Sequence, residues 1–262
     1  MNDIINEYEI RVWAIRGSGH HAVINWIASL FDQPIVFCNN VRATCTPYFY
    51  ISNVHGKELE QLYYPTSKIV RADRQKEMLK LKKECLIYNH ENTNFKKWGW
   101  HAGEEHIGKS RHQYDILILR SFKNLLASWL VNPPKKWDKF DQQITSLYRL
   151  YVDEFLKITN HLEFQTVTIW FDTWIKSREY REQKASLFFH ENQDWTLQYM
   201  ANFGGRGSHF DDFKEYYSRA WEMKVNERYK QMKDHPKYIE FMKKYKDLHQ
   251  ISNEIHKKAG LL

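Results

Sequence analysis

An apolar run that leads through a glycine turn into an amphipathic helix is the feature that most constrains how this chain folds. Residues 10–15 have the composition of a short strand. Residues 22–31 repeat apolar side chains at i, i+3, i+4 and i+7, as a helix does. Residues 114–119 and the helical pattern after them follow the same order. Strands that alternate with helices favour an α/β fold, with a mainly parallel sheet covered by helices on both faces and ligands at the carboxyl ends of the strands.

The other segments with a clear period extend this pattern along the chain. Three more strands are predicted, at residues 35–38, 84–88 and 166–171. One long amphipathic helix is predicted at residues 144–158.

Two stretches lack such a period. Residues 41–66 are expected to form a loop, and the polar, histidine-rich stretch 89–112 has the length of a functional or mobile loop. From residue 211 onward the pattern is charged and helical. We therefore expect one α/β domain over residues 1–262, in which residues 210–262 form a helical C-terminal extension.

The formal charge of +7 indicates a protein that attracts anionic ligands, although its C-terminal lysines also suit a solvated helix face. The three cysteines (Cys38, Cys45 and Cys85) form neither a disulfide framework nor a zinc pattern. We therefore expect a reducing compartment and no bound metal. No stretch approaches the ~20 apolar residues of a membrane span. We expect a cytoplasmic protein without a membrane anchor.

The glycine turn, Arg16-Gly17-Ser18-Gly19-His20-His21, joins the first strand to the first helix. Its backbone N–H groups and the positive end of the helix dipole form a suitable cradle for an anion. The nucleoside-triphosphatase loop ends in Gly-Lys-Ser/Thr, whereas His20 and His21 stand at those last two places here. The alternative is a tight turn with no ligand.

A second motif also runs from a strand end into a helix. Arg120 ends the strand and offers a forked donor suited to phosphate, and Ser121 can cap the helix that follows. Ser128 lies two turns farther along, roughly 12 Å of rise from Arg120. Spacing alone leaves open whether Arg120 and Ser128 touch one group or whether Ser128 only packs against a neighbour.

Together, these two motifs resemble those of the sulfotransferases that use 3′-phosphoadenosine 5′-phosphosulfate (PAPS). Residues 18–21 match the SGTT part of the family's PKSGTTW loop, and Arg120, Lys123 and Ser128 match RNPKDVAVS at the same spacing. The resemblance covers residues 10–31 and 114–130. It implies a three-layer P-loop-like fold, PAPS as the sulfuryl donor and no metal.

The resemblance also assigns residues to the two ends of the donor. Arg120 and Ser128 are expected to hold its 3′-phosphate, and the loop to hold its 5′-phosphosulfate; the loop residues are Arg16, Gly17, Ser18, Gly19, His20, His21 and Ala22. One departure is clear, because the family's loop lysine aligns with Gly17. Arg16, His20 or His21 would have to supply that charge.

Weaker matches add candidates elsewhere. His90 follows a strand, where many family members carry the base that deprotonates the acceptor, and His20 and His21 are the competing candidates for this catalytic role. Phe171 is expected near adenine, and Arg206 and Gly207 near the 3′-phosphate. The alternatives are a capping histidine, a core aromatic and a plain loop.

The expected function is transfer of a sulfuryl group to a hydroxyl or amine of an acceptor. Aromatic residues at 16% mildly favour a carbohydrate or a ring-bearing small molecule as that acceptor, and no nucleic acid partner is expected. Two rivals stay open. One is a P-loop nucleotide-dependent kinase, which would need magnesium and ordinarily the loop lysine; the other is a non-enzymatic binder of acidic glycan or nucleic acid. The sequence does not indicate an oligomeric state.

Overall fold

The structure is a computed structural model of the chain. It describes residues 4–32, 34–42, 46–55, 73, 75–97, 103–131, 137–188 and 224–260. Among these residues, no helix combines the length and the apolar character that crossing a bilayer requires.

A six-stranded sheet forms the centre of the molecule, in the order β3-β2-β4-β1-β5-β6. Its strands are β1 (Ile4–Ala14), β2 (Ile35–Cys38), β3 (Ile51–His55), β4 (Lys83–Glu91), β5 (Lys109–Leu119) and β6 (Gln165–Trp170). All neighbouring strands are parallel except β2 and β3. The expected α/β fold with a mainly parallel sheet is therefore confirmed.

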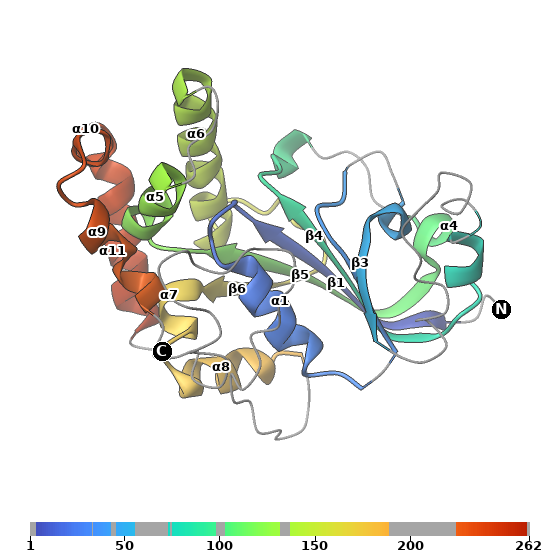
Figure 1. Cartoon of the computed structure of the whole chain (residues 1–262). Helices are drawn as coiled ribbons and strands as arrows, with labels where there is room; N and C mark the ends of the chain where they lie inside the picture. Colours follow the sequence, from blue (N-terminus) through green and yellow to red (C-terminus); the bar gives the residue numbers. More distant parts are fainter. Residues whose placement is uncertain are drawn as a thin grey trace.

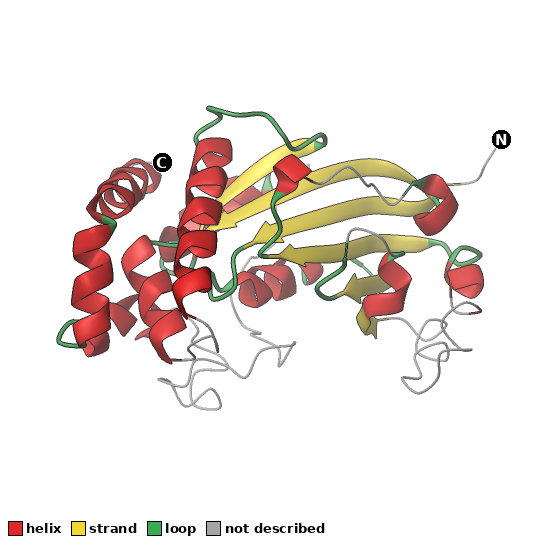
Figure 2. Ribbon diagram, turned by 90° about the horizontal axis from the view of Figure 1, so that it is seen from above, coloured by secondary structure: helices red, strands yellow, loops and turns green. Residues whose placement is uncertain are grey.

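The helices of the described residues lie around this sheet (Figures 1 and 2). They are α1 (His20–Ala28), α4 (Glu104–Ile107), α5 (Phe122–Val131), α6 (Trp137–Phe155), α7 (Phe171–Trp174), α8 (Arg178–Ala185), α9 (Arg228–Met232), α10 (Pro236–Lys244) and α11 (Lys246–Ala259), with short 3₁₀ turns η1 (Pro47–Tyr50), η2 (Phe95–Lys97) and η4 (Lys224–Glu227).

The strand order places α1 and α6 on opposite faces of the sheet. The chain moves through α1 from β1 toward β2, and through α5 and α6 in the other direction, from β5 to β6. Because parallel crossovers are right-handed, opposite directions of travel put the connecting helices on opposite faces. The crevice at such a change of direction, beyond the carboxyl ends of β1 and β5, is where open α/β sheets bind ligands.

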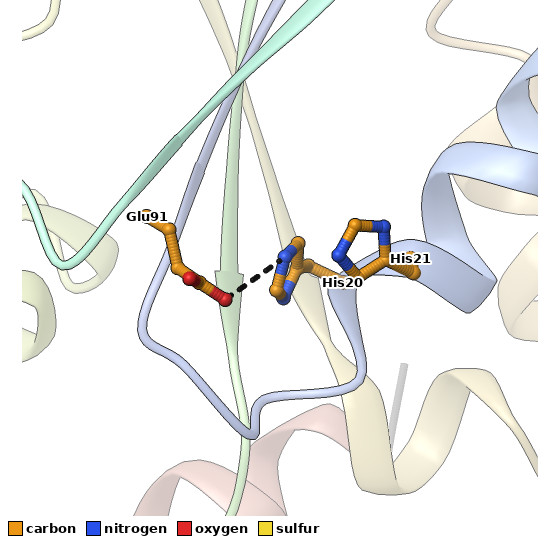
Figure 3. Close-up of side chains that lie close together, drawn as sticks. All are labelled: His20, His21 and Glu91. Atoms are coloured by element: carbon orange, nitrogen blue, oxygen red, sulfur yellow. Dashed lines mark ion pairs between the residues drawn. The ribbon is translucent and has the colours of Figure 1, made fainter. Parts of the chain in front are cut away.

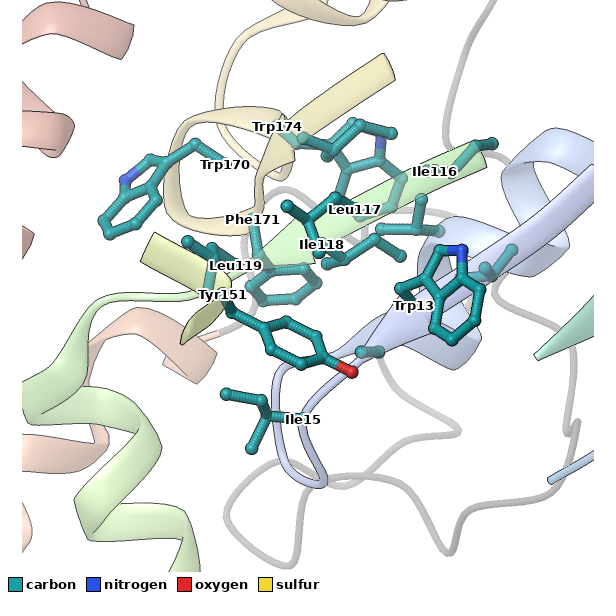
Figure 4. Packing of buried hydrophobic residues seen from close by; sticks show 14 of the residues in the cluster. Trp13, Ile15, Ile116, Leu117, Ile118, Leu119, Tyr151, Trp170, Phe171 and Trp174 are labelled. Carbon is teal, nitrogen blue, oxygen red and sulfur yellow. The ribbon is translucent and has the colours of Figure 1, made fainter. Parts of the chain in front are cut away.

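The core explains the apolar run at residues 116–119 of β5. All six residues from Tyr114 to Leu119 are buried, because helices cover both faces of the sheet at this strand. Trp13, Trp170 and Trp174 are among the largest fully buried side chains and pack around it (Figure 4). The aromatic surplus of the sequence is thus used in part to fill this core.

Two strands are longer than their apolar runs predict, because buried polar residues interrupt the pattern. β1 begins at Ile4 and includes Asn6 and Glu9, both almost fully buried. Asn6 Nδ2 donates to Ile107 O, and Glu9 accepts from Tyr88 Oη and Gln113 Nε2. β4 likewise continues to Glu91. Paired in this way, polar side chains are tolerated inside a strand but conceal it in the sequence.

The prediction that residues 41–66 and 89–112 form loops was partly wrong. Within residues 41–66 the structure has η1 and the edge strand β3, and the stretch 89–112 holds the end of β4, all of α4 and the start of β5. Helix α6 begins at Trp137 rather than at residue 144. Phe171 opens α7 instead of ending a strand.

The described part of the C-terminal extension is helical, as expected, and packs on the sheet domain. Ser252 Oγ on α11 accepts a hydrogen bond of 2.9 Å from Phe122 N, the first residue of α5. Leu248 and Ile255 are buried on the same helix. Tyr229 of α9 and Tyr238 of α10 also bond to α5, so helices α9 to α11 contact the start of α5, next to Arg120.

Candidate functional site

The glycine turn has the backbone conformation of a tight loop. Gly17 and Gly19 have φ of 86° and 84°, a region that other residues enter only with strain. Ser18 N donates to Ile15 O at 3.0 Å and Ala22 N donates to Gly19 O at 3.0 Å. These bonds close the turn at the carboxyl end of β1 and start α1.

The second motif lies directly against this turn. Arg120 Nη1 donates to Gly17 O at 3.0 Å, and Trp129 Nε1 donates to Arg16 O at 2.7 Å. Ser128 also lies close to the turn, since a Cβ atom built on Gly17 would lie 3.0 Å from Ser128 Oγ. The structure therefore brings together Arg120, Ser128 and the glycine loop, which spacing alone could not show.

Arg228 joins this group from a distant part of the chain. It is the first residue of α9, and its Nη1 donates to Ser128 Oγ at 2.9 Å. Burial lowers the pKa of Arg120 to about 9, with Asp172 opposing the shift and Arg228 adding to it. Arg120, which is only 2% exposed, and Arg228 thus bring two positive charges to the residues beside the glycine turn, an arrangement suited to a phosphate dianion.

Asp172 holds the segment that carries Arg228. Its carboxylate accepts from Ser121 N and Oγ, both at 2.7 Å, and from Asn124 Nδ2 at 3.0 Å. Asn226 Nδ2 donates to Asp172 O, and Asn226 O accepts from Asn124 Nδ2, both at 2.9 Å. This network fixes the residues before α9 against the end of β5. The strand-end motif includes Ser121 and Asn124, but nothing in the sequence marks Asn226.

Phe171 contacts both motifs. The Arg120 guanidinium carbon lies 5.2 Å from the centre of its ring, and a Cβ built on Gly19 would lie 2.3 Å from the ring. The side chain is only 2% exposed and packs on Trp174. In this structure its ring packs in the core beside the loop, so a contact to adenine remains a prediction.

Substitution of the two loop glycines should separate backbone strain from crowding. Gly17→Ala is expected to cost ~1–2 kcal/mol, the strain of a left-handed residue with a Cβ. Gly19→Ala adds displacement of the Phe171 ring, worth ~1–3 kcal/mol more. Chemical denaturation of both variants tests this order. Equal losses of unfolding free energy would show that Phe171 does not require glycine at position 19.

The two loop histidines meet a carboxylate that the sequence analysis did not single out. His20 Nε2 lies 3.5 Å from Glu91 Oε1 (Figure 3). Burial lowers the pKa of His20 well below its usual value, helped by His21, and lowers the pKa of His21 to about 4. Burial raises the pKa of Glu91, and Arg16 opposes that shift. Burial therefore favours the neutral form of both imidazoles.

His90 lies inside β4 rather than after it, and it is 1% exposed. Its Nδ1 lies 3.0 Å from Val41 O, and its ring packs 4.4 Å from that of Trp13. Because a carbonyl only accepts, Nδ1 carries the hydrogen and Nε2 is left as an acceptor. Side chains alternate along a strand, so Glu91 and not His90 points to the side of His20.

The remaining candidates are placed as follows. The backbone N–H of Arg16 donates to Asn92 Oδ1 at 2.9 Å, while the residue as a whole is exposed. Ser18 is buried, with 1% exposure. Arg206 and Gly207 lie outside the described residues.

Comparison with known proteins gives matches among solved structures only. No protein-family model and no curated protein sequence matches the chain. Among solved structures, it is similar to the crystal structure of mouse sulfotransferase SULT7A1 complexed with PAP. That match covers 96% of this chain and 89% of the other, with 12% sequence identity and a TM-score of 0.45. At this level of similarity, the likeness assigns no role to any residue.

Proposed function

We propose that this chain is a sulfotransferase that moves a sulfuryl group from PAPS to a hydroxyl or amine of its acceptor. One observation carries the proposal: Arg120, Ser128 and Arg228 converge on the glycine loop. Neither the kinase nor the glycan-binder hypothesis calls for a buried second anion site beside such a loop.

The geometry supports two anion subsites. The first is made of the loop amides and the start of α1, where unpaired N–H groups and the helix dipole favour a phosphate. The second is made of the Arg120 and Arg228 guanidiniums with the Ser128 hydroxyl. A nucleotide with phosphate groups on both sides of its ribose would fill both, and PAPS is such a nucleotide.

In the reaction we propose, the acceptor oxygen or nitrogen forms a bond to sulfur as the bond from sulfur to the phosphate oxygen breaks. The leaving phosphate oxygen gains negative charge, which positioned donors stabilise. The loop amides, Ser18, Arg16 and the neutral imidazoles of His20 and His21 are the available donors. They replace the lysine that this loop lacks.

The acceptor proton must go to a base, and we propose His90. The Val41 carbonyl fixes its tautomer with Nε2 as the acceptor, the form that a general base requires. The alternative is His20, which has Glu91 beside it as an orienting carboxylate. A carbohydrate or small-molecule hydroxyl remains the proposed acceptor class.

A thermal-shift screen separates this function from its rivals, because a ligand that binds the folded state raises Tm. Adenosine 3′,5′-bisphosphate should stabilise the protein without magnesium. A response to ATP that depends on magnesium would instead indicate a kinase. A salt-sensitive response to polyanions alone would indicate a glycan or nucleic acid binder.

The arginine subsite gives a sharper prediction. Arg120→Ala and Arg228→Ala should each weaken binding of adenosine 3′,5′-bisphosphate by about 10- to 150-fold, the equivalent of a lost charge-assisted hydrogen bond of ~1.5–3 kcal/mol. Binding of adenosine 5′-phosphate should change much less. Calorimetry with both ligands measures the difference. Arg178→Ala, which removes an exposed arginine on α8, serves as the control.

Equal losses for the two nucleotides would show that these arginines do not recognise a 3′-phosphate. Because Arg120 is buried, the partly exposed Arg228 provides the variant in which folding is least disturbed.

A further inference from the structure

Three potential metal ligands meet where β4 ends and α1 begins. His20 and His21 are the first two residues of α1, and Glu91 is the last residue of β4. One ligand atom from each residue lies within 4.8 Å of the other two (Figure 3). Glu91 follows His21 by seventy positions in the sequence, and the pairing of β1 with β4 brings it to the two histidines.

Among the three residues, the burial and contacts of His20 give the strongest indication of a ligand site. It is 3% exposed, and neither ring nitrogen has a hydrogen-bond partner among the described residues. Its Nε2 faces Glu91 Oε1 at 3.5 Å, and the buried Nδ1 of His21 also lacks a partner there. Leaving a buried polar group unsatisfied costs ~1–3 kcal/mol. A ligand that binds these nitrogens would remove that cost.

We propose that His20, His21 and Glu91 bind a divalent cation of the zinc class. Two imidazoles and one carboxylate are a ligand set that zinc uses where a fourth position stays open. Zinc bonds of ~2.0–2.1 Å require tetrahedral ligand atoms to be about 3.3 Å apart. The 3.5 Å between His20 Nε2 and Glu91 Oε1 is close to that value, and the three ligand atoms all lie within 4.8 Å of one another.

The chemistry of the surroundings agrees with this assignment. Glu91 is part-exposed, with 23% of its side chain accessible, which gives an ion a route of entry. A bound cation would also bring positive charge to a glycine loop that has no lysine.

The proposal does not depend on sulfuryl transfer, so it is tested in the absence of nucleotide. Calorimetric titration of the metal-free full chain with Zn²⁺ should show one site per chain. Titration with Co²⁺ should give the visible absorption of four-coordinate cobalt with nitrogen and oxygen ligands. A sulfur-to-cobalt charge-transfer band would instead assign the metal to the cysteines and overturn the proposal.

Conservative variants identify the ligands. Glu91→Gln and His21→Gln should each weaken Zn²⁺ binding by ~10-fold or more, since even the loss of an outer-shell contact has that effect. The matched control is Glu7→Gln, because Glu7 Oε1 lies 3.9 Å from His112 Nε2 in another His–Glu pair. Circular dichroism checks that each variant is folded.

Two results would contradict the proposal. One is a wild-type chain that binds no stoichiometric Zn²⁺. The other is binding that Glu91→Gln and His21→Gln leave unchanged in folded protein, or that Glu7→Gln weakens equally. Neither result bears on nucleotide binding by Arg120 and Arg228, so the two proposals fail separately.

Discussion

Replacement of His90 by alanine should lower kcat by ~10²–10⁴-fold, the usual loss for a general base, while donor affinity stays nearly unchanged. The physical reason is its position in β4, where the contact with Val41 O places the hydrogen on Nδ1 and leaves Nε2 in the acceptor form that a general base requires. His20 and His21 belong to the glycine turn that we propose binds the 5′-phosphosulfate, so replacing either should weaken donor binding as well. The measurements are kcat at saturating PAPS and a donor dissociation constant for all three variants.

Because His90 is buried against Trp13, one further variant separates the loss of a base from a loss of structure. His90→Asn keeps a donor for Val41 O but has nothing in the place of Nε2, so its turnover should also fall. A folded His90→Asn protein with near-normal turnover would show that His90 is not the base. If His20→Ala then lost turnover with donor still bound, the base would be the His20–Glu91 pair.

Asp115→Asn should lower the free energy of unfolding by about 3–5 kcal/mol, because it leaves the Arg11 charge buried without its counter-charge. Arg11 Nε and Nη2 both donate to the Asp115 carboxylate at 2.7 Å, and the two side chains are 3% and 0% exposed. The same carboxylate accepts from Trp13 Nε1 at 2.7 Å and from Phe164 N at 2.9 Å. The amide group of asparagine would oppose these donors with one of its own.

The control for this prediction is an ion pair of similar length at the surface. Arg178 Nε lies 2.7 Å from Glu182 Oε1, but the side chains are 55% and 44% exposed. Glu182→Gln should therefore change stability by no more than ~1 kcal/mol. Urea denaturation of both variants gives the comparison. A loss below ~1 kcal/mol for Asp115→Asn would mean that the buried pair contributes no more than an exposed one.

The sequence predicts those parts of the fold in which local pattern and burial agree. β2 matches its apolar run residue for residue, and α5 starts where the apolar face of its helix begins. Prediction fails where a polar side chain is buried with a distant partner. Glu9 in β1 meets Tyr88 and Gln113, and no local period can show such pairing.

The same limit applies to the site. The strand-end positions of Gly17 and Arg120 follow from sequence, because a parallel sheet gathers its carboxyl ends at one edge. Arg228 and Glu91 do not follow, since each reaches the loop through tertiary packing. Arg228 depends on the network around Asp172, and Glu91 on two polar residues that extend β4 beyond its apolar run.

We expect the loop and the arginines together to recognise a nucleotide with phosphates at both its 3′ and 5′ positions. Calorimetric titration of the wild-type chain, without added metal, tests it most directly. Adenosine 3′,5′-bisphosphate should bind at one site per chain, at least ~10-fold more tightly than adenosine 5′-phosphate, because a second charged subsite contributes ~1.5–3 kcal/mol. Equal affinity for the two nucleotides, or no binding of the bisphosphate, would contradict the account.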